Sequence, residues 1–127
     1  MKILLVDDSR TMRNIQKNIL KVLGEFECAE AGDGIEGLTA IAACGSRFDL
    51  ILVDWNMPKM DGLTFVKTVR EKDRVTPMIM VTTEAEKVRI IEAVKAGVNN
   101  YVIKPFTPDS LMERVNATLA KAKASAA

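Results

Sequence analysis

Leu50-Ile-Leu-Val-Asp54 is the stretch that decides the fold, because four apolar residues run without a break into a single carboxylate. A short run that is apolar throughout is typical of a strand buried on both faces, as in a parallel sheet. Lys2–Val6 and Met78–Val81 have the same character, Tyr101–Ile103 is a shorter apolar run, and Phe26–Ala31 is a more polar one. The sequence therefore predicts five strands.

Helix-type segments separate these strands, and several of them begin or end at recognisable residues. Asp33 is a plausible N-cap with Glu36 three residues later, and Gly45 is expected to end that helix. Asp61 is expected to cap the next helix, and Thr107-Pro108 reads as an N-cap followed by proline at the first helical position.

Apolar residues at helical spacing predict which face of each helix is apolar. In the first helix this face should end at Gly24, and in the fourth near Gly97. The predicted apolar positions are Ile15, Ile19, Val22 and Leu23 in the first helix, Leu63, Val66 and Val69 in the third, and Val88, Ile91 and Val94 in the fourth.

Strict alternation of five strands and five helices predicts one α/β domain, a three-layer (βα)5 unit with a parallel sheet. We expect this domain to span residues 1–122 and the Ala/Lys/Ser tail at 123–127 to fray. Right-handed crossovers bring the carboxyl ends of all the strands to one edge of the sheet. Ligands of open α/β sheets bind at that edge, so the residues that follow each strand indicate the function.

Composition excludes several classes of function. The chain has 127 residues, of which 48% are apolar and 28% charged, with a net charge of +1, so nucleic-acid binding and a polybasic membrane anchor are not supported. The absence of His excludes His-dependent triads and the usual zinc sites. Cys28 and Cys44 have no CxxC spacing, which favours structural thiols in a reducing compartment. With no signal peptide or apolar run of membrane length, we expect a cytoplasmic protein.

Charged and hydroxyl side chains follow four of the predicted strands. They are Asp7-Asp8, Asp54, Thr82-Thr83 and Lys104-Pro105. Solvation of loops would explain any one of these groups, but it explains less well a set of three carboxylates, a hydroxyl and an ammonium. Carboxylates are hard ligands that suit Mg²⁺, and a metal with Lys104 could neutralise a phosphoryl group. Asp54 is the best candidate for a nucleophile that would form an aspartyl phosphate.

This ordered set, with Asp54-Trp-Asn-Met-Pro-Lys-Met-Asp-Gly62 and Tyr101-Val-Ile-Lys-Pro-Phe-Thr107, resembles the receiver domain of bacterial two-component response regulators. The similarity covers essentially the whole chain and is greatest to chemotaxis regulators of the CheY type. It implies a flavodoxin-like fold with strand order 2-1-3-4-5. It also implies a phosphoprotein that acts in signalling and is not an enzyme beyond its own phosphorylation and dephosphorylation.

The resemblance implies a cofactor and its ligands. Mg²⁺, replaceable by Mn²⁺, would be held by Asp8, Asp54 and the backbone carbonyl of Asn56, while Asp7 would act through a bound water. Asp54 would accept the phosphoryl group from a histidine kinase or a small phosphodonor.

The resemblance also assigns roles around the phosphoryl group. Thr82 and Lys104 would each bind one of its oxygens, and the Lys104–Pro105 bond would be cis. Tyr101 would be the switch aromatic that turns inward as Thr82 moves. Glu84 and Thr83 would modulate the rates, and the extra methyl of Thr83 is expected to slow exchange with bulky donors or dephosphorylation.

The expected output surface is the fourth helix, fifth strand and fifth helix, including Tyr101, Lys87, Arg89 and Arg114. The implied partners are a histidine kinase of chemotaxis type, a flagellar motor switch protein that controls flagellar rotation, and a phosphatase. No nucleic acid or membrane partner is expected, and the protein should be a monomer. Because the sequence ends where the receiver pattern ends, the output should pass through another protein.

Three alternatives stay open at the level of sequence. A phosphorelay or phosphate-sink receiver would share the chemistry and differ in output. A flavodoxin-like module for small ligands would need phosphate loops rich in Gly, Ser and Thr, where this chain has acids. A Mg²⁺ phosphatase with an aspartate nucleophile would need a second acid two residues after Asp54, where this chain has Asn56.

Overall fold

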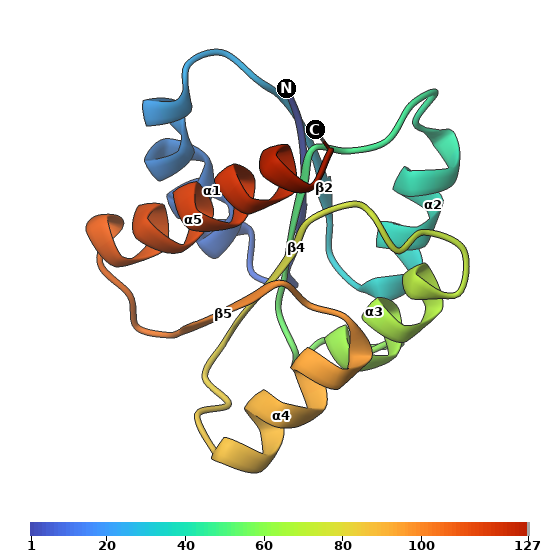
Figure 1. Cartoon of the computed structure of the whole chain (residues 1–127). Coiled ribbons are helices and arrows are strands. Elements are labelled where there is room, and N and C mark those ends of the chain that lie inside the picture. Colours follow the sequence, from blue (N-terminus) through green and yellow to red (C-terminus); the bar gives the residue numbers. More distant parts are fainter. Residues whose placement is uncertain (127) are drawn as a thin grey trace.

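The five predicted strands form one parallel sheet in the computed structural model of the chain, which describes residues 1–126 (Figure 1). Their order is β2-β1-β3-β4-β5, as expected. All five strand predictions match to within one residue at each end. The strands are β1 (Lys2–Val6), β2 (Glu27–Ala31), β3 (Leu50–Val53), β4 (Met78–Thr82) and β5 (Asn100–Ile103).

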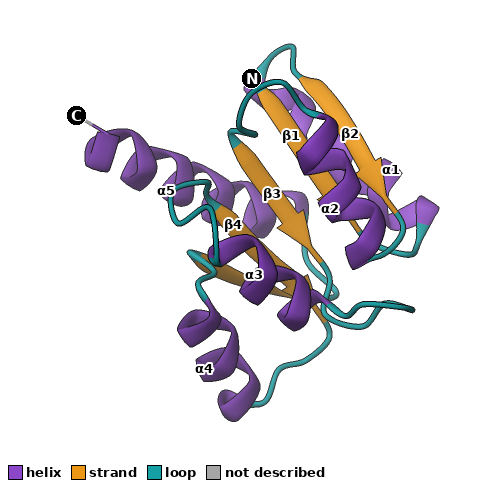
Figure 2. Cartoon of the chain, turned by 90° about the vertical axis from the view of Figure 1, so that its right-hand side faces the viewer, coloured by secondary structure: helices purple, strands orange, loops and turns teal. Residues whose placement is uncertain are grey.

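Helices cover both faces of this sheet, which gives the predicted three layers (Figure 2). One face packs against α1 (Arg10–Leu20) and α5 (Pro108–Ala126). The other packs against α2 (Gly34–Ala43), α3 (Gly62–Arg70) and α4 (Lys87–Ala96). Strands β1, β3 and β4 are buried on both faces along almost their whole length, as their continuous apolar runs predict.

The predicted helix N-caps are confirmed, whereas the predicted end of α2 is not. The Asp33 and Asp61 carboxylates accept hydrogen bonds from the backbone N–H groups of Glu36 and Thr64, both at 2.8 Å. The Thr107 hydroxyl accepts from the N–H of Ser110 at 3.0 Å. Helix α2 ends at Ala43 with the extended residue Cys44 as its C-cap, so Gly45 follows the cap and does not form it.

The predicted apolar face is correct for α3 and incomplete for α1. In α3, Val66 and Val69 are buried as expected. In α1, Ile15 is 42% exposed, and Gln16 and Leu20 are the buried residues. Val22 is 79% exposed because the α-helix ends at Leu20 and a tighter 3₁₀ turn, Lys21–Leu23, changes the direction of the side chains that follow. Gly24, with φ of 96°, closes this turn.

The predicted apolar face of α4 lies in solvent. Val88, Ile91 and Val94 are 65%, 43% and 55% exposed, and the buried residue of the helix is Ala93. The periodicity is real, but the side of α4 that meets the sheet is the one with small residues. Gly97 caps the helix with φ of 121°, as expected.

The last helix, α5, continues to Ala126. Most of the segment 123–127 is therefore helical, while its last residue lies outside the described part of the chain, and its fraying stays a prediction. Among the residues described here, none of the helices combines the length and apolar character needed to cross a membrane.

Candidate functional site

Backbone hydrogen bonds carry three of the predicted site residues past the strand ends to one edge of the sheet. The N–H of Asp7 donates to the carbonyl of Ala31 at 3.0 Å, and the N–H of Asp54 donates to that of Val6 at 2.9 Å. The N–H of Lys104 donates to the carbonyl of Thr82 at 2.9 Å. Each residue thus extends the parallel ladder by one bond, which fixes its position before its side chain makes any contact.

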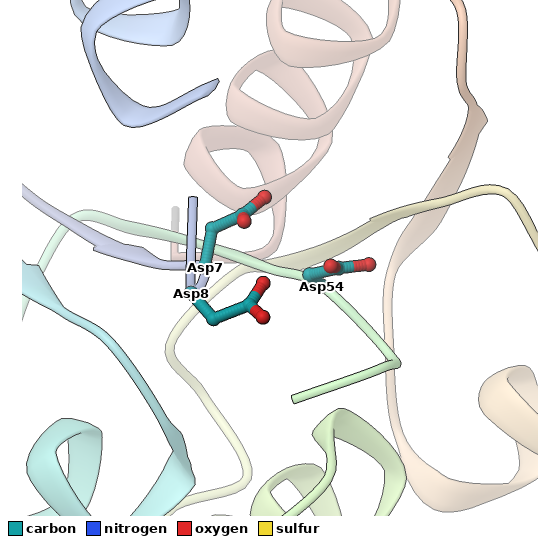
Figure 3. A group of neighbouring side chains, drawn as sticks. All are labelled: Asp7, Asp8 and Asp54. Carbon is teal, nitrogen blue, oxygen red and sulfur yellow. The ribbon is translucent and has the colours of Figure 1, made fainter. Parts of the chain in front are cut away.

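Asp7, Asp8 and Asp54 form the acidic cluster that the sequence predicts (Figure 3). Each offers a carboxylate oxygen, and these oxygens lie within 4.8 Å of one another. Asp7 is 1% exposed and Asp54 8% exposed, whereas Asp8 is open to solvent. Three hard oxygen ligands, one of them accessible from outside, are the donor set that Mg²⁺ prefers in proteins, so the residues present fit this ion.

Lys104 supplies the positive charge of the cluster. Its ammonium lies 2.9 Å from Asp7 Oδ2 and 3.4 Å from Asp54 Oδ2. The lysine joins the last strand to the first and third, and the Lys104–Pro105 peptide bond is cis, as expected. One ammonium between two buried carboxylates leaves a net negative charge at the site, which favours a further cation.

The backbone of the loop that follows Asp54 orients the Asp54 carboxylate. The N–H of Trp55 donates to Asp54 Oδ1 at 2.8 Å, so that Oδ2 faces Lys104. Burial raises the pKa of Asp54 above its ordinary value, the nearby Lys104 opposes this rise, and the charge of Asp7 adds to it. A carboxylate that is only partly neutralised in a buried site is suited to react with an electrophile.

Gly62 lets the start of α3 approach the backbone of Asp54. A Cβ atom at position 62 would lie 2.0 Å from the Asp54 carbonyl oxygen, and the N–H of Gly62 donates to the carbonyl of Trp55 at 2.8 Å. A side chain at position 62 would clash with the main chain of Asp54, so the motif Asp54–Gly62 requires glycine at its last position.

Arg13 is a site neighbour that the sequence reasoning missed. Its guanidinium donates to the main-chain carbonyl of Asp7 and, at 2.9 Å, to the carboxylate of Glu30 on β2. Lys17 binds the other oxygen of Glu30, also at 2.9 Å. Because of the hydrogen bond from Lys17 above all, the pKa of Glu30 lies below its ordinary value. A spacing of six residues between Asp7 and Arg13 gives no signal in sequence, so only the fold reveals this contact.

Glu84 connects the other predicted residues around the site. Its N–H donates to the hydroxyl oxygen of the fully buried Thr82 at 3.3 Å, and its carboxylate accepts from the side-chain amide of Asn56 at 3.1 Å. The carbonyl of Glu84 accepts a hydrogen bond from the Tyr101 hydroxyl. Burial, with a smaller contribution from the charge of Glu84, raises the pKa of Tyr101 to about 12. Thr83 is exposed.

The predicted output residues lie apart from the acidic cluster, on three neighbouring elements. Lys87 and Arg89 are exposed on α4, and Tyr101 is half-buried on β5. Arg114 is exposed on α5 and donates to the side-chain oxygen of Asn100 at 3.3 Å. The guanidinium of Arg89 lies 5.3 Å from the ring centroid of Trp55, a contact that the sequence did not predict.

A comparison with family models matches residues 3–116 to the response regulator receiver domain. This match covers most of the chain, and the matched segment holds the acidic cluster, Thr82 and Lys104. The chain belongs to the response regulator receiver domain family, whose members are signalling modules that bind Mg²⁺ at an acidic pocket.

Within this family, the chain is similar to several chemotaxis proteins. The Helicobacter pylori chemotaxis protein CheY1 is 48% identical over 121 residues, which is 94% of this chain and 97% of that protein. The Pseudomonas aeruginosa chemotaxis protein CheY is 48% identical over 117 residues, 91% of this chain and 93% of that protein. The crystallised Vibrio cholerae CheY4 superposes with a TM-score of 0.82 at 36% identity, covering 92% of this chain and 97% of that one.

Proposed function

We propose that the protein is a receiver that accepts a phosphoryl group on Asp54 from a histidine kinase and passes the signal through the surface formed by α4, β5 and α5. The observation that carries the proposal is the position of Asp54, which lies at the carboxyl edge of the sheet beside two other carboxylates and Lys104. A flavodoxin-like module would need donor-rich loops at this edge, and the first and third strands end in acids.

In the proposed reaction a carboxylate oxygen of Asp54 forms a bond to phosphorus while the bond to the donor's leaving group breaks. Lys104, which holds Asp7 and Asp54 in the unmodified protein, pairs with an oxygen of the transferred group. We assign Mg²⁺ to Asp8, Asp54 and the backbone carbonyl of Asn56, with Asp7 acting through a water. When bound, Mg²⁺ or Mn²⁺ supplies positive charge that offsets the carboxylates and the phosphoryl oxygens.

Thr82 links this reaction to the output surface. Its hydroxyl oxygen accepts from the N–H of Glu84, so a shift of the hydroxyl toward a phosphoryl oxygen would act on this bond. The same residue, Glu84, holds the Tyr101 hydroxyl through its carbonyl. Movement of Thr82 therefore disturbs the acceptor of Tyr101 and the loop that begins α4, which is how a local charge can change a distant surface.

We propose a partner of the flagellar motor switch type and a kinase of the chemotaxis type, because relatives that match over almost their whole length are chemotaxis proteins. The setting would be the cytoplasm, with the protein acting as a monomer and a phosphatase as a further partner. A phosphorelay or phosphate-sink role is the second candidate, since it needs the same site and a different output.

The mass of the intact protein after treatment with acetyl phosphate tests the reaction. Wild-type protein with Mg²⁺ should gain one labile phosphoryl group, and neither Asp54→Asn nor protein without Mg²⁺ should gain it. Asp109→Asn, a carboxylate far from the cluster in sequence and placed in the first turn of α5, is the control and should behave as wild type. Folded wild-type protein that gains no adduct would overturn the proposal.

Binding of a peptide from a flagellar motor switch protein tests the output. Affinity should rise when acetyl phosphate and Mg²⁺ are added, and it should not rise for Asp54→Asn. Adduct formation without any change in peptide affinity would favour the relay or sink role.

Thr83 is proposed to limit access to the phosphoryl group. Thr83→Ala removes one methyl group and the hydroxyl from an exposed position beside Thr82 and should speed dephosphorylation or exchange with bulky donors. Equal rates for the variant and wild type would show that this position has no such role.

A further inference from the structure

Trp55 connects the phosphoacceptor to the rest of the molecule through three separate contacts. Its N–H holds Asp54 Oδ1 at 2.8 Å, and its carbonyl accepts from the N–H of Gly62 at 2.8 Å. Trp55 as a whole is 5% exposed, and the guanidinium of Arg89 lies over its indole ring, 5.3 Å from the ring centroid. The amide that orients Asp54 and the indole that lies against Arg89 therefore belong to the same residue.

Arg89 belongs to α4, in which Ala93 is the buried residue. Its side chain is 45% exposed, and it pairs with Glu92 at 3.8 Å on the same helix. A cation above the face of an indole is attracted by the ring quadrupole, and the attraction is larger when the ring is shielded from water, as it is here. The charge of Arg89 also acts on Tyr101, whose pKa it lowers against the larger effect of burial.

We infer that Arg89 is a positioning residue for Asp54: by stacking on Trp55, it ties the place of α4 to the orientation of the phosphoacceptor. This inference rests on the proposed function of Asp54. It adds a contact between α4 and the β3–α3 loop that does not pass through Thr82 or Tyr101. Because coupling between sites is reciprocal, whatever draws Arg89 away from Trp55 also changes the reactivity of Asp54.

The chain contains one tryptophan, so its fluorescence reports this contact without a label. Removing the guanidinium in Arg89→Gln should uncover the ring, shift its emission to the red and increase quenching by acrylamide in the unmodified protein without Mg²⁺. Arg89→Lys keeps the charge, and its emission maximum and acrylamide quenching should lie between those of Arg89→Gln and wild type. Lys95→Gln removes an exposed cation from the last turn of the same helix and is the matched control, with wild-type fluorescence.

The second readout is the initial rate at which acetyl phosphate adds a phosphoryl group in the presence of Mg²⁺. Arg89→Gln should lower this rate by about two- to fivefold, the factor that corresponds to loss of a cation–π contact at a partly exposed site. Arg89→Lys should restore part of the rate, and Lys95→Gln should leave it unchanged. A purely structural role would alter unfolding without altering this rate, so urea unfolding is measured for each variant.

The outcomes separate this inference from the proposed function. Fluorescence of Arg89→Gln identical to wild type would overturn the inference, as would a changed spectrum with a wild-type rate. If wild-type protein itself gains no adduct, the proposed function fails, whereas the fluorescence of the unmodified variants still shows whether Arg89 covers Trp55.

Discussion

Helices α3 and α4 lie side by side on the same face of the sheet and have nearly equal lengths, 9 and 10 residues, but they are held in different ways (Figure 2). Helix α3 buries Phe65, Val66 and Val69, and its N-cap Asp61 makes a side-chain hydrogen bond. Helix α4 buries Ala93, and its N-cap Glu86 makes none among the described residues. The helix after Asp54 thus contributes large side chains to the core, whereas the helix after Thr82 contributes one small residue and is the less firmly packed of the two.

Truncation of one large side chain in each helix should give the largest contrast. Phe65→Ala leaves a cavity in the core and should lower the free energy of unfolding by ~3–5 kcal/mol. Ile91→Ala on the exposed side of α4 should change it by no more than about 0.5 kcal/mol. Urea unfolding measures both, and similar losses for the two variants would contradict the distinction between the helices.

Arg70 is the next test, because it ties the end of α3 to the end of α4. The side chain is 7% exposed and donates to the carbonyls of Gly97, Asp73 and Thr76 at 3.0, 2.9 and 2.7 Å. Arg70→Gln leaves one buried and two partly buried carbonyls without these donors and should cost about 2–3 kcal/mol of unfolding free energy.

Arg74→Gln, four residues further along and exposed, removes the same charge and should cost little. If the two arginine variants unfold at the same urea concentration, the anchoring role of Arg70 is wrong.

Gly62 tests the other end of α3, where the helix meets the loop that follows Asp54. Gly62→Ala forces the Asp54 carbonyl away from a new methyl group and should cost about 1–3 kcal/mol. It should also slow phosphorylation by acetyl phosphate, because Asp54 is displaced. Gly45→Ala is the matched control, since a Cβ atom there meets nothing within 4 Å. Retention of the wild-type rate in Gly62→Ala would show that the loop can adjust.

The smallest expected effect is a spectroscopic one, at Tyr101 on β5, the strand that follows α4. Tyr101 is the one tyrosine of the chain, and its pKa of about 12, raised chiefly by burial, should appear as the midpoint of its absorbance change with pH. In urea the midpoint should fall toward the ordinary value of about 10.

The raised pKa of Tyr101 also makes the stability of the folded protein depend on pH. Between about pH 10 and pH 12 the unfolded chain loses the phenolic proton while the folded chain keeps it, so stability falls as the pH rises through this window. A midpoint near 10 in the folded protein would mean that the Tyr101 side chain is not buried as described.

Much of the framework and of the acidic cluster was predictable from sequence. Buried strands leave continuous apolar runs such as Leu50–Val53, and parallel topology then brings Asp7, Asp54 and Lys104 to one edge whatever the detailed packing. Caps such as Asp61 are local, so they too are visible in the sequence.

The sequence did not predict which side chains are covered by other elements of the fold, or which side chains of separate elements meet. The stripe of Val88, Ile91 and Val94 has helical spacing, but spacing shows only that the residues share a face, not that this face meets the core. Gln16 is the converse case, a polar side chain that is 2% exposed and whose oxygen has no hydrogen-bond partner among the described residues. Contacts such as those between Arg13 and Asp7 or Arg89 and Trp55 join separate elements and leave no local pattern.

The position of β1 has a consequence for how the chain folds. Because β1 pairs with both β2 and β3, residues 2–53 contain three adjacent strands. The same segment holds Asp7 and Asp8, and Asp54 follows it directly. Of the later strands, β4 pairs with β3, and β5 pairs with β4 at the edge of the sheet. We therefore expect the half of the molecule that carries the carboxylates to organise early, and the α4–β5 edge to close last and to show the fastest exchange of its backbone amide hydrogens with solvent.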